Sequence, residues 1–327
     1  MRGASGVTNL KDASRDAVRD VPPSLGVVKR RRVRHQPRPL AAPVAEVPVD
    51  AERTSLYTAD ELYDSASYAD SVDARAYAWS REPHSREAAR VQAMHDFAID
   101  EALDAWIAGR HLVGIMGGHA VQRGEPTYGS AARLGHALAQ RSVVATGGGP
   151  GAMEAANLGA WLAAYDVAQV DAAVARLGSV PGFRPSVQAW ADLALEVRAE
   201  LADRPQQSSL GIPTWFYGHE PPNVFCDAIA KYFRNATREA ILLEVCDAGI
   251  VFLPGTAGTV QEVFQDACEN YYGTPESVAP MVLVGERYWT EELPVWPLLC
   301  SLAQGRDMQG RIFLVDSVAE AAAVVAP

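Results

Sequence analysis

The stretch Asp247-Ala-Gly-Ile-Val-Phe-Leu253, followed by Pro254-Gly-Thr-Ala-Gly-Thr259, decides the fold. The apolar, partly β-branched run from Ile250 to Leu253 shows no polar alternation, which is typical of a strand buried on both faces of a parallel sheet. The glycines, proline and threonines that follow predict a tight turn. From Val260 onward, apolar residues recur at helical spacing. A strand, a Gly-rich turn and a helix in this order point backbone N–H groups and a helix N-terminus at an anion.

Glu262 has two interpretations at this stage. Thr259 and Glu262 have the spacing of a capping box, which closes a helix N-terminus without any ligand. The same carboxylate also stands in the first predicted helical turn, beside the proposed anion site, where it could meet the sugar of a bound nucleotide. The local sequence leaves both interpretations open.

Two further Gly-rich turns follow predicted strands. The strand over 112–116 ends at Gly117-Gly118-His119, and the strand over 143–145 ends at Thr146-Gly-Gly-Gly-Pro-Gly151. Additional strands are predicted over 209–212, 281–284 and 312–315, and helices over 85–109, 130–140, 152–165 and 224–245, with two more in 166–205. This alternation predicts an α/β fold, a doubly wound, Rossmann-like parallel sheet with helices on both faces. Ligands of such sheets bind at the carboxyl ends of the strands.

The turns indicate a phosphorylated ligand of a restricted kind. Glycines let the backbone approach a ligand closely, and helix N-termini favour negative charge. The turn from Gly147 to Gly151 is not GxGxxG, and no acidic residue ends a second strand about 20 residues further on, which argues against a dinucleotide. The chain has no GxxxxGK[ST] motif, which argues against a P-loop NTPase.

Length and charge suggest how the chain is divided. It has 327 residues and a net charge of −11; residues 1–40 hold ten Lys or Arg against three Asp, a balance of +7 that leaves −18 for the rest. We expect a disordered basic, Pro-rich tail over 1–55, a linker with short helices over 56–84, and the Rossmann-like domain over 85–327 with a helical insertion at about 166–205. The basic cluster Lys29–Arg34 is either a solvated tail or a contact for nucleic acid or an acidic partner.

Composition excludes several other classes. The acidic body argues against a broad nucleic-acid-binding face. No apolar run approaches the length of a membrane helix, and the basic N-terminus is not followed by a secretory h-region, so we expect a cytoplasmic protein. The cysteines are Cys226, Cys246, Cys268 and Cys300. Their spacing fits no zinc motif, which predicts free, buried thiols and no metal site.

The predicted helix over 224–245 adds cations near the third turn. Asp227, Lys231, Arg234 and Arg238 would share one face of this helix. Arg238 lies about two turns before the strand whose end carries Glu262. An Arg and a carboxylate beside a phosphate site suit cleavage of a bond to a ribose phosphate, because a carboxylate stabilises oxocarbenium character or activates water.

At this point the motifs resemble a known family. Thr146-Gly-Gly-Gly-Pro-Gly-Ala-Met-Glu-Ala-Ala-Asn157 is similar to the GGGxxGxMEAAN segment of the LOG family of nucleoside 5′-monophosphate phosphoribohydrolases, long mislabelled as lysine decarboxylases. Pro254-Gly-Thr-Ala-Gly-Thr-Val-Gln-Glu262 resembles its PGGxGTxxE motif, and Arg238 stands where the family has its Arg. The resemblance covers roughly residues 86–290, including the loop with Gly211-Ile-Pro, Glu220 and Asn223.

The resemblance implies hydrolysis of the N-glycosidic bond of an AMP-like nucleoside 5′-monophosphate, giving a free base and ribose 5-phosphate. It implies a homodimer or larger oligomer and no cofactor. Arg238 and Glu262 would be the catalytic pair, and Glu154 would face the ligand. The residues that the turns and the resemblance assign to phosphate or nucleotide binding are Gly117, Gly118, Gly147, Gly148, Gly149, Gly151, Met153, Glu154, Glu220, Asn223, Pro254, Gly255, Thr256, Gly258 and Thr259.

Several positions depart from the family pattern. Thr256 replaces the second Gly of PGG, Glu239 stands where the family commonly has Lys, and Gly117-Gly118-His119 replaces a GSS-type turn. Three hypotheses follow. The first is the phosphoribohydrolase; the second, motivated by Thr256 and Glu239, is a non-catalytic carrier or sensor of a nucleotide or phosphorylated cofactor. The third, motivated only by Lys29–Arg34, is a nucleic-acid-associated protein.

Overall fold

The computed structural model describes residues 47–82, 85–201, 208–217 and 220–325. The predicted basic tail up to residue 46, with its cluster Lys29–Arg34, lies outside the described residues. Residues 47–55, which the sequence pattern assigns to that tail, pack on the body of the protein. Val47 and Val49 contact the hydrophobic core, and Arg53 is buried.

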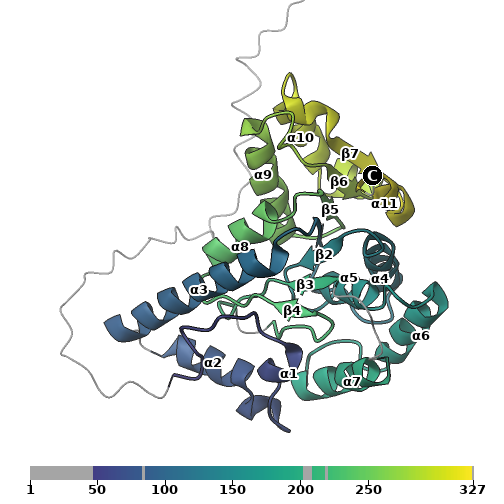
Figure 1. Cartoon of the computed structure of the whole chain (residues 1–327). Coiled ribbons are helices and arrows are strands. Elements are labelled where there is room, and N and C mark those ends of the chain that lie inside the picture. Colours follow the sequence, from purple (N-terminus) through teal and green to yellow (C-terminus); the bar gives the residue numbers. More distant parts are fainter. Residues whose placement is uncertain (1–46, 83–84, 202–207, 218–219, 326–327) are drawn as a thin grey trace, which may run out of the picture. The chain divides into compact units, whose positions relative to one another are not determined.

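The described strands form one parallel sheet in the order β4-β3-β2-β1-β5-β6-β7 (Figure 1). β1 lies at its centre, with Gly114 opposite Ala145 of β2 and Ile250 of β5. The strands are β1 (Leu112–Met116), β2 (Val143–Thr146), β3 (Ser209–Gly211), β4 (Ala228–Ile229), β5 (Ile250–Phe252), β6 (Met281–Val284) and β7 (Ile312–Val315). The predicted parallel α/β sheet is confirmed.

Two groups of helices cover the two faces of this sheet (Figure 1). On one side α4 packs against α5 and α11, and on the other α9 packs against α8 and α10. Glycines let α4 and α5 approach closely, since a Cβ on Gly159 would stand 1.8 Å from Ala132 O. These helices are α4 (Pro126–Leu138), α5 (Ala152–Trp161), α8 (Asn235–Glu244), α9 (Ala257–Tyr272), α10 (Val295–Ala303) and α11 (Val318–Val325).

The remaining elements flank the sheet. α3 begins after Ser85, as predicted, because the Ser85 side chain accepts a hydrogen bond from Ala88 N at 3.0 Å. The predicted insertion forms two helices, α6 and α7, joined by the loop 178–186. The elements are α3 (Arg86–Ile107), α6 (Val167–Leu177), α7 (Val187–Glu200), the π-helix η2 (Tyr288–Glu292) and the 3-10 helix η3 (Asp307–Gly310).

The predicted helix over 224–245 is wrong in its first half. Residues 224–233 are almost all buried, run through the short strand β4 and pair with β3, and α8 begins only at Asn235. A run buried on every side cannot be one face of an amphipathic helix. The predicted polar face therefore does not exist: Lys231 is buried, and Asp227 accepts hydrogen bonds from Ser208 N and Ser209 N.

Of the two interpretations left open for Glu262, the capping box with Thr259 is ruled out. α9 begins at Ala257 with Thr256 as its N-cap, so Thr259 is the third helical residue and Glu262 lies one turn further along. Thr259 is buried, and its methyl and hydroxyl groups pack over Gly255. The Thr-x-x-Glu spacing therefore falls inside the helix and does not mark its beginning.

The segment before α3 completes the edge of the sheet beyond β4. It forms α1 (Ala59–Leu62), the 3-10 helix η1 (Tyr68–Asp70) and α2 (Val72–Arg81). Tyr57 and Ile229 exchange backbone hydrogen bonds of 3.0 and 2.9 Å. The Lys231 ammonium pairs with the Asp73 carboxylate, both buried, and Trp215 Nε1 donates to the same carboxylate at 2.7 Å. Burial lowers the pKa of Lys231, and Asp73 opposes that shift.

Two predictions made from the composition, on membrane helices and on the cysteines, can be compared with the structure. Within the described ranges, no helix is both long enough and apolar enough to cross a bilayer. The four cysteines are free, as predicted. Their predicted burial holds for Cys226 and Cys246 but is wrong for Cys268, which is exposed on α9, and for Cys300, which is partly exposed on α10.

Candidate functional site

The three Gly-rich turns meet at the edge of the sheet that is formed by the carboxyl ends of its strands. They follow β2, β1 and β5, which are adjacent parallel strands, so their carboxyl ends lie side by side. The turns touch: Ala152 N, at the start of α5, donates to Gly118 O at 3.1 Å. A Cβ on Gly118 would stand 3.6 Å from Pro254 O and 3.9 Å from Gly255 Cα. Segments far apart in the sequence thus build one continuous surface.

The turn from Gly147 to Gly151 is held by a buried polar network. Asn223 N donates to Gly148 O at 2.8 Å, and Asn223 Nδ2 donates to Gly149 O at 3.1 Å and to Asn157 Oδ1 at 2.9 Å. Gly148 has φ +67, and a Cβ there would stand 2.8 Å from Pro213 Cδ. Asn223 and Gly148 therefore fix the conformation of this turn.

The N-terminus of α9 is exposed at the carboxyl end of β5. Thr256, Ala257 and Gly258 are exposed, and the Thr256 side chain makes no cap hydrogen bond. The first-turn N–H groups therefore have no side-chain partner from their own cap. Position 255 needs a glycine, because a Cβ on Gly255 would stand 2.2 Å from Thr259 Oγ1. The Gly255 carbonyl oxygen accepts a hydrogen bond from Tyr288 OH at 2.8 Å.

Arg238 and Glu262 lie beside these turns. Arg238 is 8% exposed, and a Cβ on Gly147 would stand 3.5 Å from its Nη1 and 2.8 Å from Met153 Sδ. Arg238 Nη2 donates to Asn235 Oδ1 at 3.1 Å, whereas its buried Nε has no hydrogen-bond partner in the part of the chain that the structure describes. Buried donors without a partner are rare in folded proteins, and a place in a catalytic or binding site is one explanation for them.

Glu262 titrates near neutrality. Burial raises its pKa to about 7; Arg238 opposes this shift, and Glu239 and Glu220 add to it. Three carboxylates and one guanidinium thus share this part of the edge. Perturbed carboxylates in such a position are typical of functional sites.

Glu239, which stands where the LOG family commonly has Lys, is held in place by its neighbours. Glu239 accepts hydrogen bonds from Asn235 Nδ2 at 2.6 Å and from Gln261 Nε2 at 2.8 Å. Asn235 Nδ2 also donates to Tyr217 OH at 3.1 Å, and burial raises the pKa of that phenol. Glu239 therefore keeps a fixed negative charge close to Arg238 and Glu262. Asn235 and Tyr217 belong to no motif, and Gln261 occupies a variable position within one, so the sequence gives no signal for these three residues.

Glu220 and His119 connect the first and second turns. Glu220 Oε1 lies 3.6 Å from His119 Nδ1, and a Cβ on Gly149 would stand 3.7 Å from Glu220 Oε2. His119 is half exposed and lines a cavity together with Gly151 and Glu154. The structure thus gathers residues predicted from three separate motifs around one edge.

Glu154 lies in the first turn of α5 and is fully buried. The Arg123 guanidinium donates two hydrogen bonds to its carboxylate, one of them from Nε at 3.0 Å. Burial alone would lower the pKa of Arg123, but the Glu154 carboxylate raises it above its usual value. Sequence reasoning missed Arg123, because an ion pair between residues so far apart leaves no periodic signal.

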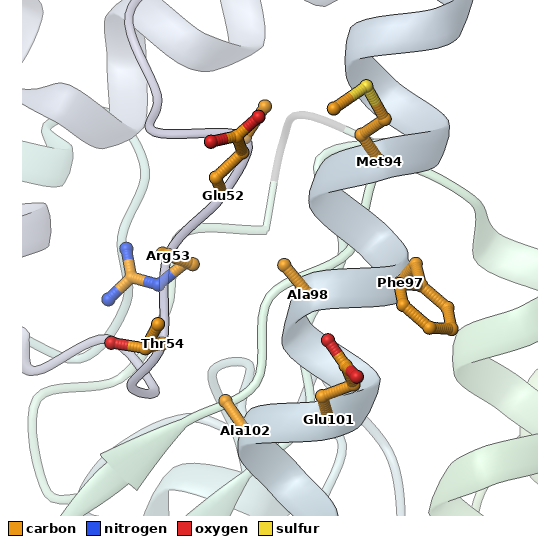
Figure 2. Close-up of a pocket in the computed structure, with 9 residues that line it drawn as sticks. Glu52, Arg53, Thr54, Met94, Phe97, Ala98, Glu101 and Ala102 are labelled. Atoms are coloured by element: carbon orange, nitrogen blue, oxygen red, sulfur yellow. The ribbon is translucent and has the colours of Figure 1, made fainter.

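A second cavity, of about 310 Å³, lies elsewhere, between residues 51–54 and α3 (Figure 2). In Figure 2, Ala98 and Ala102 face the segment that carries Glu52 and Thr54, while Phe97 points away from it. None of the residues assigned to ligand binding from the sequence lines this cavity. It is therefore separate from the candidate site.

No protein-family model matches the chain, and no curated protein matches it significantly. Among solved structures it is similar to the molybdenum cofactor binding protein from the phototrophic bacterium Rippkaea orientalis, with 18% identity over 66% of this chain and 95% of that chain and a TM-score of 0.38. It is also similar to the Moco carrier protein from Chlamydomonas reinhardtii, with 18% identity, the same coverage and a TM-score of 0.40. At these values the likenesses carry no conclusion about this chain.

Proposed function

We propose that this chain binds a phosphorylated, nucleotide-like small molecule at the carboxyl ends of β1, β2 and β5, with the phosphate at the N-terminus of α9. The observation that carries the proposal is the exposed first turn of α9, which has no side-chain cap. Arg238, whose buried Nε has no partner within the described residues, lies close enough to Glu262 of the same helix to oppose the rise of its pKa. A helix N-terminus and a guanidinium are both groups that bind phosphate.

The motifs give this proposal independent support. The segments Thr146–Asn157 and Pro254–Glu262 resemble those of the LOG family, whose members act on nucleoside 5′-monophosphates. In this chain the two segments lie on either side of the turn after β1, and each of them contacts that turn. The residues proposed to bind the ligand are those that the sequence analysis assigns to phosphate or nucleotide binding, with Arg238 and Glu262.

The test is a change of charge at Gly258. A Cβ on Gly258 would meet no atom within 4 Å, so Gly258→Asp introduces no clash and an acidic residue in the first turn suits the helix. Its carboxylate would compete with the ligand's phosphate. We expect calorimetry with AMP, GMP and ribose 5-phosphate to show binding to the parent protein and at least a tenfold loss of affinity in the variant.

Gly310→Asp is the matched control. Gly310 is also exposed, and a Cβ there also meets nothing within 4 Å, but it lies in η3. This variant has the same change of net charge and should bind as the parent does. Equal affinities in all three proteins, or no binding of any phosphorylated probe, would contradict the proposal. The molybdenum cofactor is included as a separate probe.

Hydrolysis of the N-glycosidic bond is a second candidate function, and Glu262 favours it. A carboxylate with a pKa of about 7 beside an arginine has the protonation behaviour of a general base at neutral pH. In the proposed step, Glu262 takes a proton from a water molecule whose oxygen bonds to C1′ of the ribose. The C1′–N bond breaks, the base leaves with its electron pair and receives the proton that Glu262 took from water, so that Glu262 returns to the carboxylate, and Arg238 orients the ribose phosphate.

Base release separates hydrolysis from simple retention of the ligand. The purified chain is incubated with AMP, GMP, CMP, UMP, IMP and an N6-substituted adenosine monophosphate, and the free base is measured by chromatography. Hydrolysis predicts release by the parent protein and none by Glu262→Gln. Binding without release, in both proteins, would leave the carrier or sensor as the function and remove the hydrolase. The fixed charge of Glu239 beside Glu262 is the feature that favours this second outcome.

A further inference from the structure

The insertion between α5 and β3 walls a cavity of about 520 Å³ at the ligand-binding edge. This volume is in the range of small-molecule pockets. One side comes from the loop after β1, the floor from the start of α5, and the other side from the loop between α6 and α7. The lining residues are His119, Ala120, Val121, Gln122, Pro150, Gly151, Glu154, Pro181, Gly182, Phe183, Arg184 and Trp190.

Arg123 fixes the insertion in place. Its backbone N–H donates to Pro181 O at 2.9 Å, and its Nη1 donates to Trp190 O at 3.1 Å. The same side chain pairs with Glu154. Both sides of the cavity and its floor are therefore joined through one buried guanidinium, and the cavity has its shape before any ligand arrives.

One wall of the cavity is aromatic. Phe183 and Trp190 pack edge to face, with their ring centroids 6.4 Å apart. Trp190 is buried, whereas Phe183 is partly exposed. The Arg184 guanidinium lies 5.6 Å from the Phe183 ring centroid and is exposed. A partly exposed aromatic ring with an exposed guanidinium over it can stack on a planar group if that guanidinium swings aside to contact the group's edge.

The polar groups in the cavity favour hydrogen-bond acceptors. Arg184 offers donors only, and Gln122 adds an amide. The one carboxylate in the lining, Glu154, is already taken by Arg123. A planar ligand with acceptors on its edge, such as a 6-oxopurine, matches this set better than adenine, because a guanidinium can donate to O6 and N7 together.

The cavity and the proposed phosphate site lie on opposite sides of the turn after β1. Gly151 lines the cavity, and a Cβ on Gly151 would stand 2.6 Å from Gly118 O. Gly118 in turn lies against Gly255. Only the turn after β1 therefore stands between the cavity and the N-terminus of α9.

We propose that this cavity receives the heteroaromatic base of the bound nucleotide, with Phe183 stacking on the ring and Arg184 donating to its acceptor edge, so that 6-oxopurine nucleotides are preferred over AMP. This inference rests on the proposed function, because it assumes that the turns hold the phosphate. It assigns the insertion at 166–205 to base recognition.

The test compares affinities for ribose 5-phosphate, AMP, GMP and IMP by calorimetry with the full chain. For the parent protein we expect GMP and IMP to bind at least tenfold more tightly than ribose 5-phosphate and at least threefold more tightly than AMP. In Phe183→Ala, affinity for GMP should fall at least fivefold, while affinity for ribose 5-phosphate stays unchanged. In Arg184→Ala, the preference of GMP over AMP should disappear.

Phe97→Ala is the control for loss of a partly exposed phenylalanine, since Phe97 lines the other cavity. It should leave every affinity unchanged. Phe183→Leu keeps apolar bulk without the ring and should lose most of what Phe183→Ala loses. If GMP binds Phe183→Ala and Arg184→Ala as it binds the parent, the inference is overturned while the phosphate site stands. If no probe binds the parent, the proposed function fails, and this inference fails with it.

Discussion

The Arg123 guanidinium donates two hydrogen bonds to the Glu154 carboxylate, and both side chains are buried. Arg123 belongs to the loop after β1, and Glu154 to the first turn of α5. This ion pair therefore joins two of the three Gly-rich turns at the proposed ligand-binding edge. Because the pair is buried, removing one partner leaves an uncompensated charge in a poorly solvated place.

Substitution of Arg123 by leucine should be strongly destabilising. We expect Arg123→Leu to lower the free energy of unfolding by about 3–5 kcal/mol, because Glu154 loses its partner. Adding Glu154→Gln to that variant should restore part of the loss. Urea denaturation of the parent, both single variants and the double variant measures the coupling. Strictly additive effects would show that the two side chains do not depend on each other.

Two glycines that lie three residues apart, Gly255 and Gly258, should respond differently to substitution by alanine. A Cβ on Gly255 would stand 2.2 Å from Thr259 Oγ1, so Gly255→Ala should cost about 1–3 kcal/mol of stability. A Cβ on Gly258 meets no atom within 4 Å, so Gly258→Ala should stay within about 1 kcal/mol of the parent. Thermal unfolding followed by circular dichroism compares the two. Equal destabilisation would mean that Thr259 does not pack over Gly255.

Binding of an anion should depend on the protonation of Glu262. Its pKa of about 7 means that Glu262 gains negative charge as the pH rises from 6 to 8, next to the proposed phosphate site. Affinity for ribose 5-phosphate, relative to that of Glu262→Gln, should therefore fall about threefold to tenfold over this range. The variant corrects for ionisation of the phosphate itself. Calorimetry at both pH values measures the ratio, and a constant ratio would separate Glu262 from the ligand.

Asp266 gives a test of stability against pH. Burial raises its pKa from 3.8 to about 8, and Glu269 adds to the shift. The folded state thus holds a proton that the unfolded state releases, and the free energy of unfolding falls as the pH rises from 3.8 toward 8. Asp266→Asn should remove this term and stabilise the protein at pH 8 by roughly 2 kcal/mol or more. Urea denaturation at pH 5 and pH 8 measures it; a larger gain at pH 5 would contradict the assignment.

The central strands were predictable because their signal is local. β1, β2 and β5 are short apolar runs without alternation, each followed by a Gly-rich turn, and their parallel pairing follows from the helices between them. The meeting of the three turns follows from the same argument. Arg238 and Glu262 could be placed near them from the motifs alone.

Two secondary-structure predictions that the structure corrects concern stretches whose conformation depends on contacts with distant residues. The charges before Asn235 recur at helical spacing and predict a helix, but the Lys231 side chain turns inward and pairs with Asp73. The start of α9 was placed three residues late, because Thr259 is buried over Gly255 and does not cap the helix. No pattern within either stretch reveals the partner that decides its conformation.

The pairing of Lys231 with Asp73 limits how this chain can be shortened. Trimming the protein to begin at Ser85, where the Rossmann-like domain was predicted to start, would remove Asp73 and leave an ammonium group beside Trp215 in the interior. Such a fragment would have to deprotonate Lys231 or admit water at the sheet edge. Residues 57–81 are thus built into the folded body, and any shorter protein made for study needs to keep them.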